Sequence, residues 1–174
     1  MKEVVIRPVA ASDLNAIVAI YNHYVRTATV TFDEVESTVD DWAAKSERIV
    51  GAGIPFLVAA SADGDILGYA LAQPWSPKSA YRFTVENSIY LAPEAAGRGI
   101  GTRLLAAFLE GAQAAGLRQV IAVIADEGAE ASLVLHRRAG FIEVGHLFRT
   151  GMKFGRWIGV HFLQLELTPP EEPE

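Results

Sequence analysis

One carboxylate in this 174-residue chain stands where its capacity to accept a proton would be enhanced. Glu86 lies inside a run of mostly apolar and aromatic residues that extends from Ala80 to Leu91. Such neighbours remove water from a carboxylate, and because desolvation disfavours the charged form, they raise its pKa. A carboxylate with a raised pKa is suited to general-base catalysis, so Glu86 is a candidate base. The alternative is that Glu86 points outward from a strand and has no chemical role.

A glycine-rich loop follows the same run. Residues 96–101 are AGRGIG, and they lie between an expected strand and an expected helix. Glycines let backbone N–H groups converge on an anion, and the positive end of a helix dipole would point at the same place. The loop is therefore suited to hold a pyrophosphate, although a loop of this composition can also connect a strand to a helix without binding anything.

Two common phosphate-binding arrangements do not fit this loop. A Rossmann dinucleotide fold places its glycine loop after the first strand, whereas four expected strands precede residues 96–101 here. A Walker loop needs Lys and then Ser or Thr after its last glycine, but Gly101 is followed by Thr102 and Arg103. The loop must therefore serve a different nucleotide-binding arrangement, or none.

The spacing of apolar side chains predicts the elements that position these residues. Ser12 or Asp13 can cap a first helix, and Thr38 can cap a second. Asp63-Gly64 is a strong hairpin signal between two apolar runs. We expect helices after Asp13, after Thr38, after Gly101 and over residues 130–139, and strands over 3–7, 56–60, 66–73, 80–91, 119–124, 141–148 and 160–167.

These elements predict an α/β fold with one mixed sheet. The early strands form antiparallel pairs, and the later strands alternate with helices, which together indicate about seven strands and about four helices. Residues 151–157 are expected to form a loop between the last two strands. We expect one domain over residues 1–168, followed by a disordered acidic tail over 169–174, which consists of Pro and Glu.

Composition and charge exclude several classes of function. The chain has no cysteine and four scattered histidines, so we expect no disulfide and no metal cofactor. The formal net charge of −6 argues against nucleic-acid binding, which requires clustered Lys and Arg. Because no apolar run approaches the length of a membrane span and the N-terminus resembles a strand, we expect no membrane association and a cytoplasmic protein.

The order of the motifs resembles that of the GNAT superfamily of acetyl-CoA-dependent N-acetyltransferases. The glycine loop follows the fourth expected strand, and residues 132–141, SLVLHRRAGF, come after the fifth. Further segments resemble the phosphinothricin-acetyltransferase-like branch in order and over nearly the whole chain. They are TFDE at 31–34, AYRFTVENS at 80–88, IAVI at 121–124, LH at 135–136 and GRW at 155–157.

The resemblance implies a GNAT fold, in which the strands before and after the glycine loop splay apart and acetyl-CoA lies in the gap. It implies that backbone amides around the loop hold the pyrophosphate and that Leu91 flanks the pantetheine. The residues expected to contact acetyl-CoA are Leu91, Gly97, Arg98, Gly99, Ile100, Gly101, Thr102 and Ser132.

The resemblance also assigns catalytic and acceptor-binding residues. Glu86 matches the branch's base, and His136 stands where many GNAT enzymes carry a tyrosine that protonates the CoA thiolate, or it orients the substrate. Arg offers a planar fork for a carboxylate, which favours a compact amino-acid-like acceptor over a polyamine. The positions that resemble the acceptor pocket are Thr31, Phe32, Lys78, Tyr81 and Arg82.

Three positions depart from the family's usual residues. Ala96 replaces Gln or Arg at the start of the loop, Ala129 replaces Asn, and Gly159 replaces Asp. These departures keep open the alternative of a non-catalytic acyl-CoA-binding sensor, and a peptide or protein N-acetyltransferase is a second, enzymatic alternative. The preferred prediction is an N-acetyltransferase of small amino-acid-like amines such as phosphinothricin or methionine sulfoximine. The resemblance also implies a homodimer to which the loop around Trp157 contributes.

Overall fold

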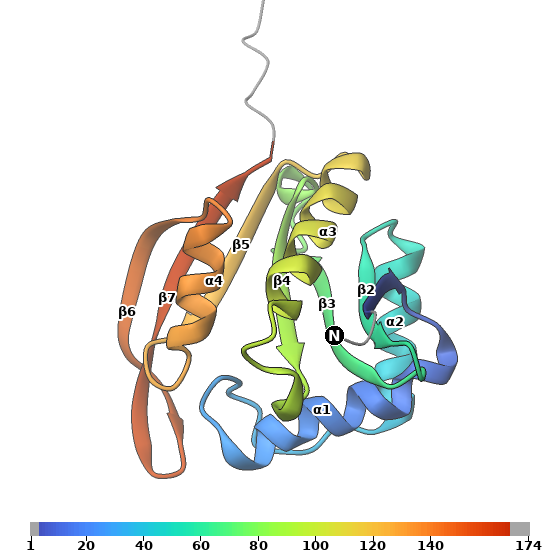
Figure 1. The fold of residues 1–174 in the computed structure, drawn as a ribbon. Coiled ribbons are helices and arrows are strands. Elements are labelled where there is room, and N and C mark those ends of the chain that lie inside the picture. The colour runs from blue at the N-terminus through green and yellow to red at the C-terminus, as the bar shows by residue number, and fades with distance from the viewer. Residues whose placement is uncertain (1–3, 168–174) are drawn as a thin grey trace, which may run out of the picture.

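One mixed sheet of seven strands organises the chain (Figure 1), in the order β1-β2-β3-β4-β5-β7-β6. The computed structural model describes residues 4–167. Every neighbouring pair of strands is antiparallel except β4 and β5, which confirms the predicted fold class. The elements are β1 Val4–Pro8, α1 Leu14–Thr27, α2 Val39–Gly51, β2 Phe56–Ser61, β3 Ile66–Pro74, β4 Thr84–Leu91, α3 Ile100–Ala114, β5 Gln119–Ala125, α4 Glu130–Arg138, β6 Ile142–Lys153 and β7 Arg156–Glu166.

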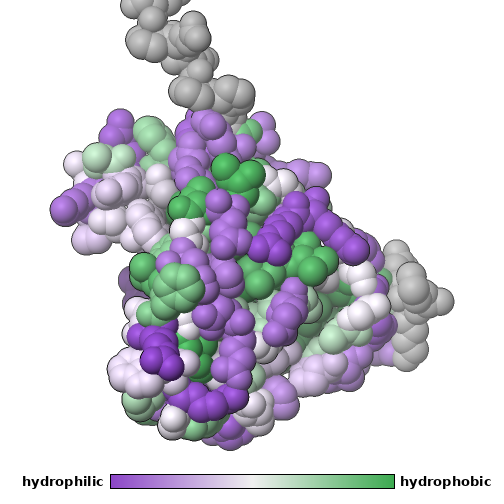
Figure 2. Space-filling view, turned by 90° about the vertical axis from the view of Figure 1, so that its left-hand side faces the viewer, coloured by the Kyte–Doolittle hydropathy of each residue, from purple (hydrophilic) through white to green (hydrophobic). Residues whose placement is uncertain are grey.

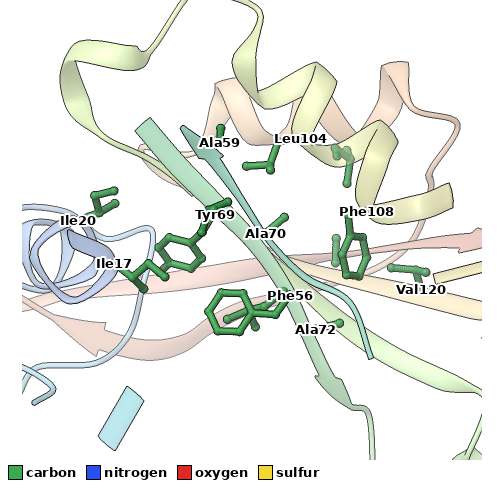
Figure 3. Close-up of a cluster of buried hydrophobic side chains, with 14 of the residues drawn as sticks. Ile17, Ile20, Phe56, Ala59, Tyr69, Ala70, Ala72, Leu104, Phe108 and Val120 are labelled. Carbon is green, nitrogen blue, oxygen red and sulfur yellow. The ribbon is translucent and has the colours of Figure 1, made fainter. Parts of the chain in front are cut away.

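Helices cover both faces of the sheet, and side-chain alternation decides which strand residues meet them. On β3, Tyr69 contacts Trp42 of α2 on one face, with ring centroids 5.3 Å apart. Figure 3 shows Tyr69 pointing toward Ile17 of α1, whereas Leu104 and Phe108 of α3 lie across the sheet. Full burial of side chains of this size contributes about 1.5–3 kcal/mol each. The core therefore has two layers, with α1 and α2 on one face and α3 and α4 on the other.

The two central strands separate partway along their length. The parallel pairing of β4 with β5 ends at Glu86 and Ile121, although β4 continues to Leu91 and β5 to Ala125. The ends beyond the last pair diverge, and Figure 1 shows the resulting gap between the two ribbons. The predicted splay of the central strands is confirmed, and Glu86 lies at the point where it begins.

Two expected boundaries were wrong. Residues 151–157 do not form a loop, because β6 runs to Lys153 and β7 starts at Arg156, joined by a turn at Phe154 and Gly155. Both turn residues have positive φ, of 52° and 71°, which matches a tight two-residue hairpin turn.

The strand expected over residues 80–91 begins later than predicted. Ser79–Tyr81 form a single 3-10 turn, and β4 starts only at Thr84.

By contrast, Thr38 caps α2 as predicted, since its side chain accepts a hydrogen bond from the Asp41 N–H. Asp13 does not cap α1 through its side chain; its carboxylate pairs instead with Arg7 at 2.7 Å.

The proposed acidic tail over 169–174 lies outside the described residues. Among residues 4–167, no helix has both the length and the apolar character needed to cross a membrane.

Candidate active site

A cleft of about 930 Å³ opens where β4 and β5 separate. Successive residues of a strand point to opposite faces of its sheet, so neighbours on β4 enter the cleft from different sides. Glu86 lies toward α1 and α2, whereas Asn87 meets His136 of α4. The cleft therefore has two sides, one on each face of the sheet, and they are connected through the gap between the strands.

Glu86 is half-buried and lines the first side of the cleft. Burial raises the pKa of its carboxyl group, and the positive charge of Lys45 partly offsets that effect. In the register of β3 and β4, Glu86 lies opposite Gln73. Within residues 4–167, no Lys, Arg or His side chain forms an ion pair with the Glu86 carboxylate. An unpaired carboxylate with a raised pKa has the properties of a general base.

His136 lies on the second side and is only 2% exposed. Its Nδ1 lies 2.8 Å from the Ser132 carbonyl oxygen and must donate to it, so its Nε2 accepts from the Asn87 side-chain amide at 3.0 Å. Burial lowers the pKa of the imidazole, and the bond to Ser132 partly offsets this. His136 is therefore a neutral ring whose orientation is fixed by two hydrogen bonds.

The glycine loop reaches the same side of the cleft as His136. Gly97 and Gly99 have positive φ, of 73° and 74°, and a Cβ at either position would meet no atom within 4 Å. Helix α3 begins at Ile100 without a side-chain cap, so its first N–H groups are free to bind an anion. These open glycines and uncapped amides fit a pyrophosphate.

The predicted cofactor residues are mostly brought together here. Gly101 lies next to Leu91 and Leu135, since its Cβ would stand 3.5 Å from each of these side chains. Two of the predicted residues lie elsewhere, because Ile100 is buried in the core and Arg98 is exposed outside the cleft lining. Those that line the cleft are Leu91, Gly97, Gly99, Gly101, Thr102 and Ser132.

The loop between α1 and α2 forms a wall on the Glu86 side. Thr31 and Phe32 line the cleft, as does Asp33. The Tyr21 hydroxyl contacts the Thr31 hydroxyl at 2.9 Å and donates to Asp33. This loop is thus held against α1 with two predicted acceptor residues in the cleft.

The other three predicted acceptor residues lie outside the cleft lining. Lys78, Tyr81 and Arg82 occupy the exposed turn that precedes β4. The Arg82 guanidinium lies over the Phe83 ring at 4.6 Å and donates to the Ser79 carbonyl at 3.3 Å. Within this chain, the structure does not bring these residues to Glu86.

The chain matches the family description "Acetyltransferase (GNAT) family" over residues 17–141. It belongs to this family. That range begins within α1, ends just beyond α4, and includes Glu86, the glycine loop and His136.

Sequence relatives narrow the comparison within the GNAT family. The chain is 45% identical to a phosphinothricin N-acetyltransferase from Alcaligenes faecalis, over 93% of this chain and 82% of the relative. It is 40% identical to an L-methionine sulfoximine/L-methionine sulfone acetyltransferase from Pseudomonas paraeruginosa, over 94% and 95% of the two chains.

A solved GNAT structure has nearly the same fold. It is the phosphinothricin acetyltransferase from Sinorhizobium meliloti in complex with acetyl-CoA, with a TM-score of 0.91 and 39% identity. The match covers 97% of this chain and 94% of that chain.

One departure from the family's usual residues has a physical explanation in this structure. A Cβ at Gly159 would stand 2.4 Å from Asp126 Oδ2 and 2.4 Å from the Leu147 carbonyl oxygen. The Gly159 N–H donates to Asp126 Oδ1 at 3.0 Å, so a carboxylate reaches this place from residue 126. Ala129, by contrast, leaves α4 without a side-chain cap.

Sequence reasoning missed three residues that the structure places at or behind the site. Lys45 and Asn87 line the cleft, and Lys153 is buried behind its acceptor wall. Asn87 is adjacent to Glu86 in the sequence, and strand alternation could have placed it on the opposite side of the sheet. Lys45 and Lys153 belong to distant segments, and only the tertiary fold brings them here.

A metal site has no support in the described part of the chain. Residues 4–167 contain no group of three or more His, Asp or Glu side chains that could hold a metal ion.

Proposed function

We propose that this chain transfers the acetyl group of acetyl-CoA to the primary amine of a small amino-acid-like acceptor of the phosphinothricin or methionine sulfoximine type. One observation carries the proposal: a single cleft has a desolvated carboxylate, Glu86, on one side of the strand gap and an uncapped glycine-loop helix on the other. The names of the relatives support the acceptor class.

The cofactor side of the cleft suits acetyl-CoA. The amides of residues 97–102 would hold the pyrophosphate, with Arg98 adding positive charge from outside and Ile100 anchoring the helix start. Leu91 would flank the pantetheine, and Ser132 would contact acetyl-CoA from the start of α4. The proposed reaction requires no metal.

Glu86 would act as the general base. The acceptor amine is mostly protonated near neutral pH, and only its neutral form is a nucleophile. The Glu86 carboxylate takes one proton from the ammonium, the nitrogen bonds to the acetyl carbon, and the carbon–sulfur bond breaks. The sulfur of CoA leaves as a thiolate and takes up the second proton, which the nitrogen loses as it becomes an amide nitrogen.

His136 would serve on the thiolate side. Its Nε2 accepts from Asn87 and its proton lies on Nδ1, so the neutral ring orients the site. Donation to the CoA sulfur from Nε2 would require a prior proton at that atom, which burial opposes. The geometry thus favours the orienting role over the acid role.

The acceptor would lie between Glu86 and the wall formed by Thr31 and Phe32. The exposed turn with Lys78, Tyr81 and Arg82 stays a predicted contributor. Its contribution would require that the turn or a partner subunit brings these side chains to the cleft.

We further propose that the chain is a cytoplasmic homodimer. β6 is an edge strand of the sheet, and edge strands are available for association. Figure 2 views this side of the molecule, where apolar side chains lie among polar ones. The exposed apolar residues of the β6–β7 hairpin include Ile142, Val144, Phe148, Met152 and Trp157. Because acetyl-CoA is used inside cells, the proposed activity favours the cytoplasm, and sedimentation velocity would test the dimer.

Release of free CoA tests the proposed activity. The native protein is incubated with acetyl-CoA and a panel of phosphinothricin, methionine sulfoximine, ordinary α-amino acids, polyamines and short peptides. We expect release with the amino-acid-like compounds. Release only with peptides would support a peptide acetyltransferase, and acetyl-CoA binding without release on any acceptor would support an acyl-CoA-binding sensor.

A further inference from the structure

Two opposite charges line the acceptor side of the cleft without pairing. Lys45 of α2 and Glu86 of β4 both line it, and the pKa of each responds to the other's charge, although Asp33 of the acceptor wall raises the pKa of Lys45 more than Glu86 does. No carboxylate oxygen within residues 4–167 lies closer than 4.0 Å to Lys45 Nζ. Desolvation lowers the pKa of Lys45, as expected for an ammonium group without an ion-pair partner.

The aromatic floor beneath Lys45 fixes its position. Its Nζ lies 4.6 Å from the centroid of the Trp42 ring, and Trp42 is 2% exposed. A cation over an aromatic face is attracted by the ring, and the buried ring limits the rotamers that the lysine stem can adopt. The ammonium is therefore held at the cleft wall, and it can still accept an anionic partner.

An α-amino acid has the complementary charges. Its ammonium and carboxylate are attached to one carbon, so a ligand whose amine lies at Glu86 must place its carboxylate close by. Lys45 and Glu86 face such a zwitterion with the opposite charge at each end. The ligand would supply both ion-pair partners that these two residues lack within the protein.

The other cations of the chain are less well placed. Of the Lys and Arg residues among residues 4–167, only Lys45 and Arg138 line the cleft. Arg138 comes from α4, and its neighbour Leu135 lies within van der Waals reach of Gly101 of α3 on the cofactor side. The Lys153 ammonium is already bound to the Thr31 carbonyl oxygen.

We propose that Lys45 binds the carboxylate of the acceptor amino acid while Glu86 holds its amine. This assignment rests on the proposed function and specifies its acceptor class as zwitterionic α-amino acids. It moves the carboxylate-binding role from Arg82, on the turn before β4, to a side chain that already lines the cleft.

Two acceptors and four proteins test the assignment. The acceptors are methionine sulfone and the amine that lacks its carboxylate. The proteins are the wild type, Lys45→Met, Arg82→Ala and Arg118→Met, the last as a control cation that is exposed and lies outside the cleft lining. Methionine retains the apolar stem over Trp42. We expect Lys45→Met to raise the KM for methionine sulfone roughly ten- to hundredfold, which corresponds to the loss of a charge-assisted contact, with little change for the amine. Arg118→Met should match the wild type.

Binding of methionine sulfone by calorimetry, in the presence of CoA, separates this assignment from the proposed function. Weaker binding to Lys45→Met than to the wild type supports the assignment even if turnover is absent. Equal binding to the two proteins, or a preference lost in Arg82→Ala but kept in Lys45→Met, overturns it. Failure of the wild type to bind methionine sulfone also overturns it. Absence of CoA release with every amino acid defeats the proposed function instead.

Discussion

The ammonium of Lys153 donates a hydrogen bond of 2.8 Å to the carbonyl oxygen of Thr31, although the two residues are 122 positions apart in the chain. Lys153 ends β6 and is 1% exposed. Nearby, a Cβ at Gly151 would stand 2.3 Å from Phe32 Cε2, so the ring packs directly on the β6 backbone. The β6–β7 hairpin therefore holds the acceptor wall in place through two separate contacts.

We predict that Lys153→Met and Gly151→Ala both raise the acceptor KM. The first removes the bond to Thr31, and the second displaces the Phe32 ring, so each alters the same wall. The expected increase is about tenfold, the value of one buried hydrogen bond. Acetyl-CoA affinity should not change, because neither residue lines the cofactor side. Gly145→Ala on the same strand is the matched control, since its Cβ would meet no atom within 4 Å. An acceptor KM equal to that of Gly145→Ala would contradict this account.

We predict that Glu86→Gln lowers kcat about 10²- to 10⁴-fold at neutral pH, the usual contribution of general-base catalysis. The deficit should shrink at high pH, where the amine loses its proton without assistance. The rate measured from pH 5 to pH 10 for both proteins checks this. A parallel pair of profiles would show that the base is another group.

Although Glu86→Gln should lower activity, it should raise the stability of the folded protein at neutral pH. Burial raises the pKa of Glu86 in the folded state, so the stability this group contributes is complete below its unfolded pKa and is lost as the pH rises through the folded value. At pH 7 the ionised carboxylate is therefore unfavourable. We expect Glu86→Gln to have the higher free energy of unfolding at pH 7 and to match the wild type below about pH 4, near the ordinary pKa of glutamate. Urea titrations at the two pH values measure the difference, and a constant difference would refute the linkage.

We predict that Gly99→Val abolishes tight binding of acetyl-CoA, raising its Kd more than about tenfold, because the side chain would enter the space that the pyrophosphate needs. The left-handed φ of 74° also makes any side chain costly, by about 1–2 kcal/mol. Gly116→Val is the matched control, since Gly116 has a φ of 83° and equally open surroundings at the other end of α3. Both variants should lose similar stability, but only Gly99→Val should lose cofactor binding. Calorimetry with equal loss in both variants would contradict a phosphate site here.

We predict that Asn87→Ala and His136→Ala each lower kcat about tenfold and that the double variant is hardly worse than either. The Asn87 amide donates to His136 Nε2, so loss of either residue disrupts the same unit. Asn87 Oδ1 is buried without a hydrogen-bond partner in the described structure, so this side chain has capacity for one more contact. A double variant whose effect equals the sum of the single effects would show that the two residues act independently.

Local signals in the sequence were sufficient for most of the fold. Asp63-Gly64 marked the β2–β3 hairpin, and Thr38 marked the start of α2, because turns and caps depend on residues close in the chain. The β6–β7 turn was missed because Gly151, Lys153 and Arg156 look like loop residues. The Phe154-Gly155 pair, which precedes a run of apolar residues, was the signal that could have identified it.

The site was only partly predictable, for a physical reason. Glu86 and the glycine loop could be predicted because the properties that suit them to their roles depend on residues that are close to them in the sequence. Lys45 reaches the cleft because α2 packs on Tyr69 through Trp42. The spacing of apolar residues within 39–51 does not predict that contact. Lys78, Tyr81 and Arg82 were predicted at the cleft because they resemble the acceptor-pocket positions of the family branch, and the turn before β4 places them outside the cleft lining.

The last prediction concerns Gly159 and Asp126. A Cβ at residue 159 would overlap both the Asp126 carboxylate and the Leu147 carbonyl, so Gly159→Ala should cost about 1–3 kcal/mol, as overpacked sites do. Gly159→Asp should cost more, because the His146 hydrogen bond lowers the pKa of Asp126 and keeps it ionised beside the new carboxylate.

The excess cost of Gly159→Asp over Gly159→Ala should therefore depend on residue 126. In an Asp126→Asn background the repulsion between carboxylates is absent, and the two substitutions should cost the same, while the overlap with the Leu147 carbonyl keeps both of them destabilising. The six proteins are the wild type and Asp126→Asn, each with Gly, Ala or Asp at residue 159. Urea unfolding at neutral pH and low salt measures their free energies of unfolding, with Gly145→Ala as the open-site control. If Gly159→Ala is as mild as Gly145→Ala, the strands yield and the glycine is not required. If the excess cost of Gly159→Asp persists in the Asp126→Asn background, its origin is not the charge of Asp126.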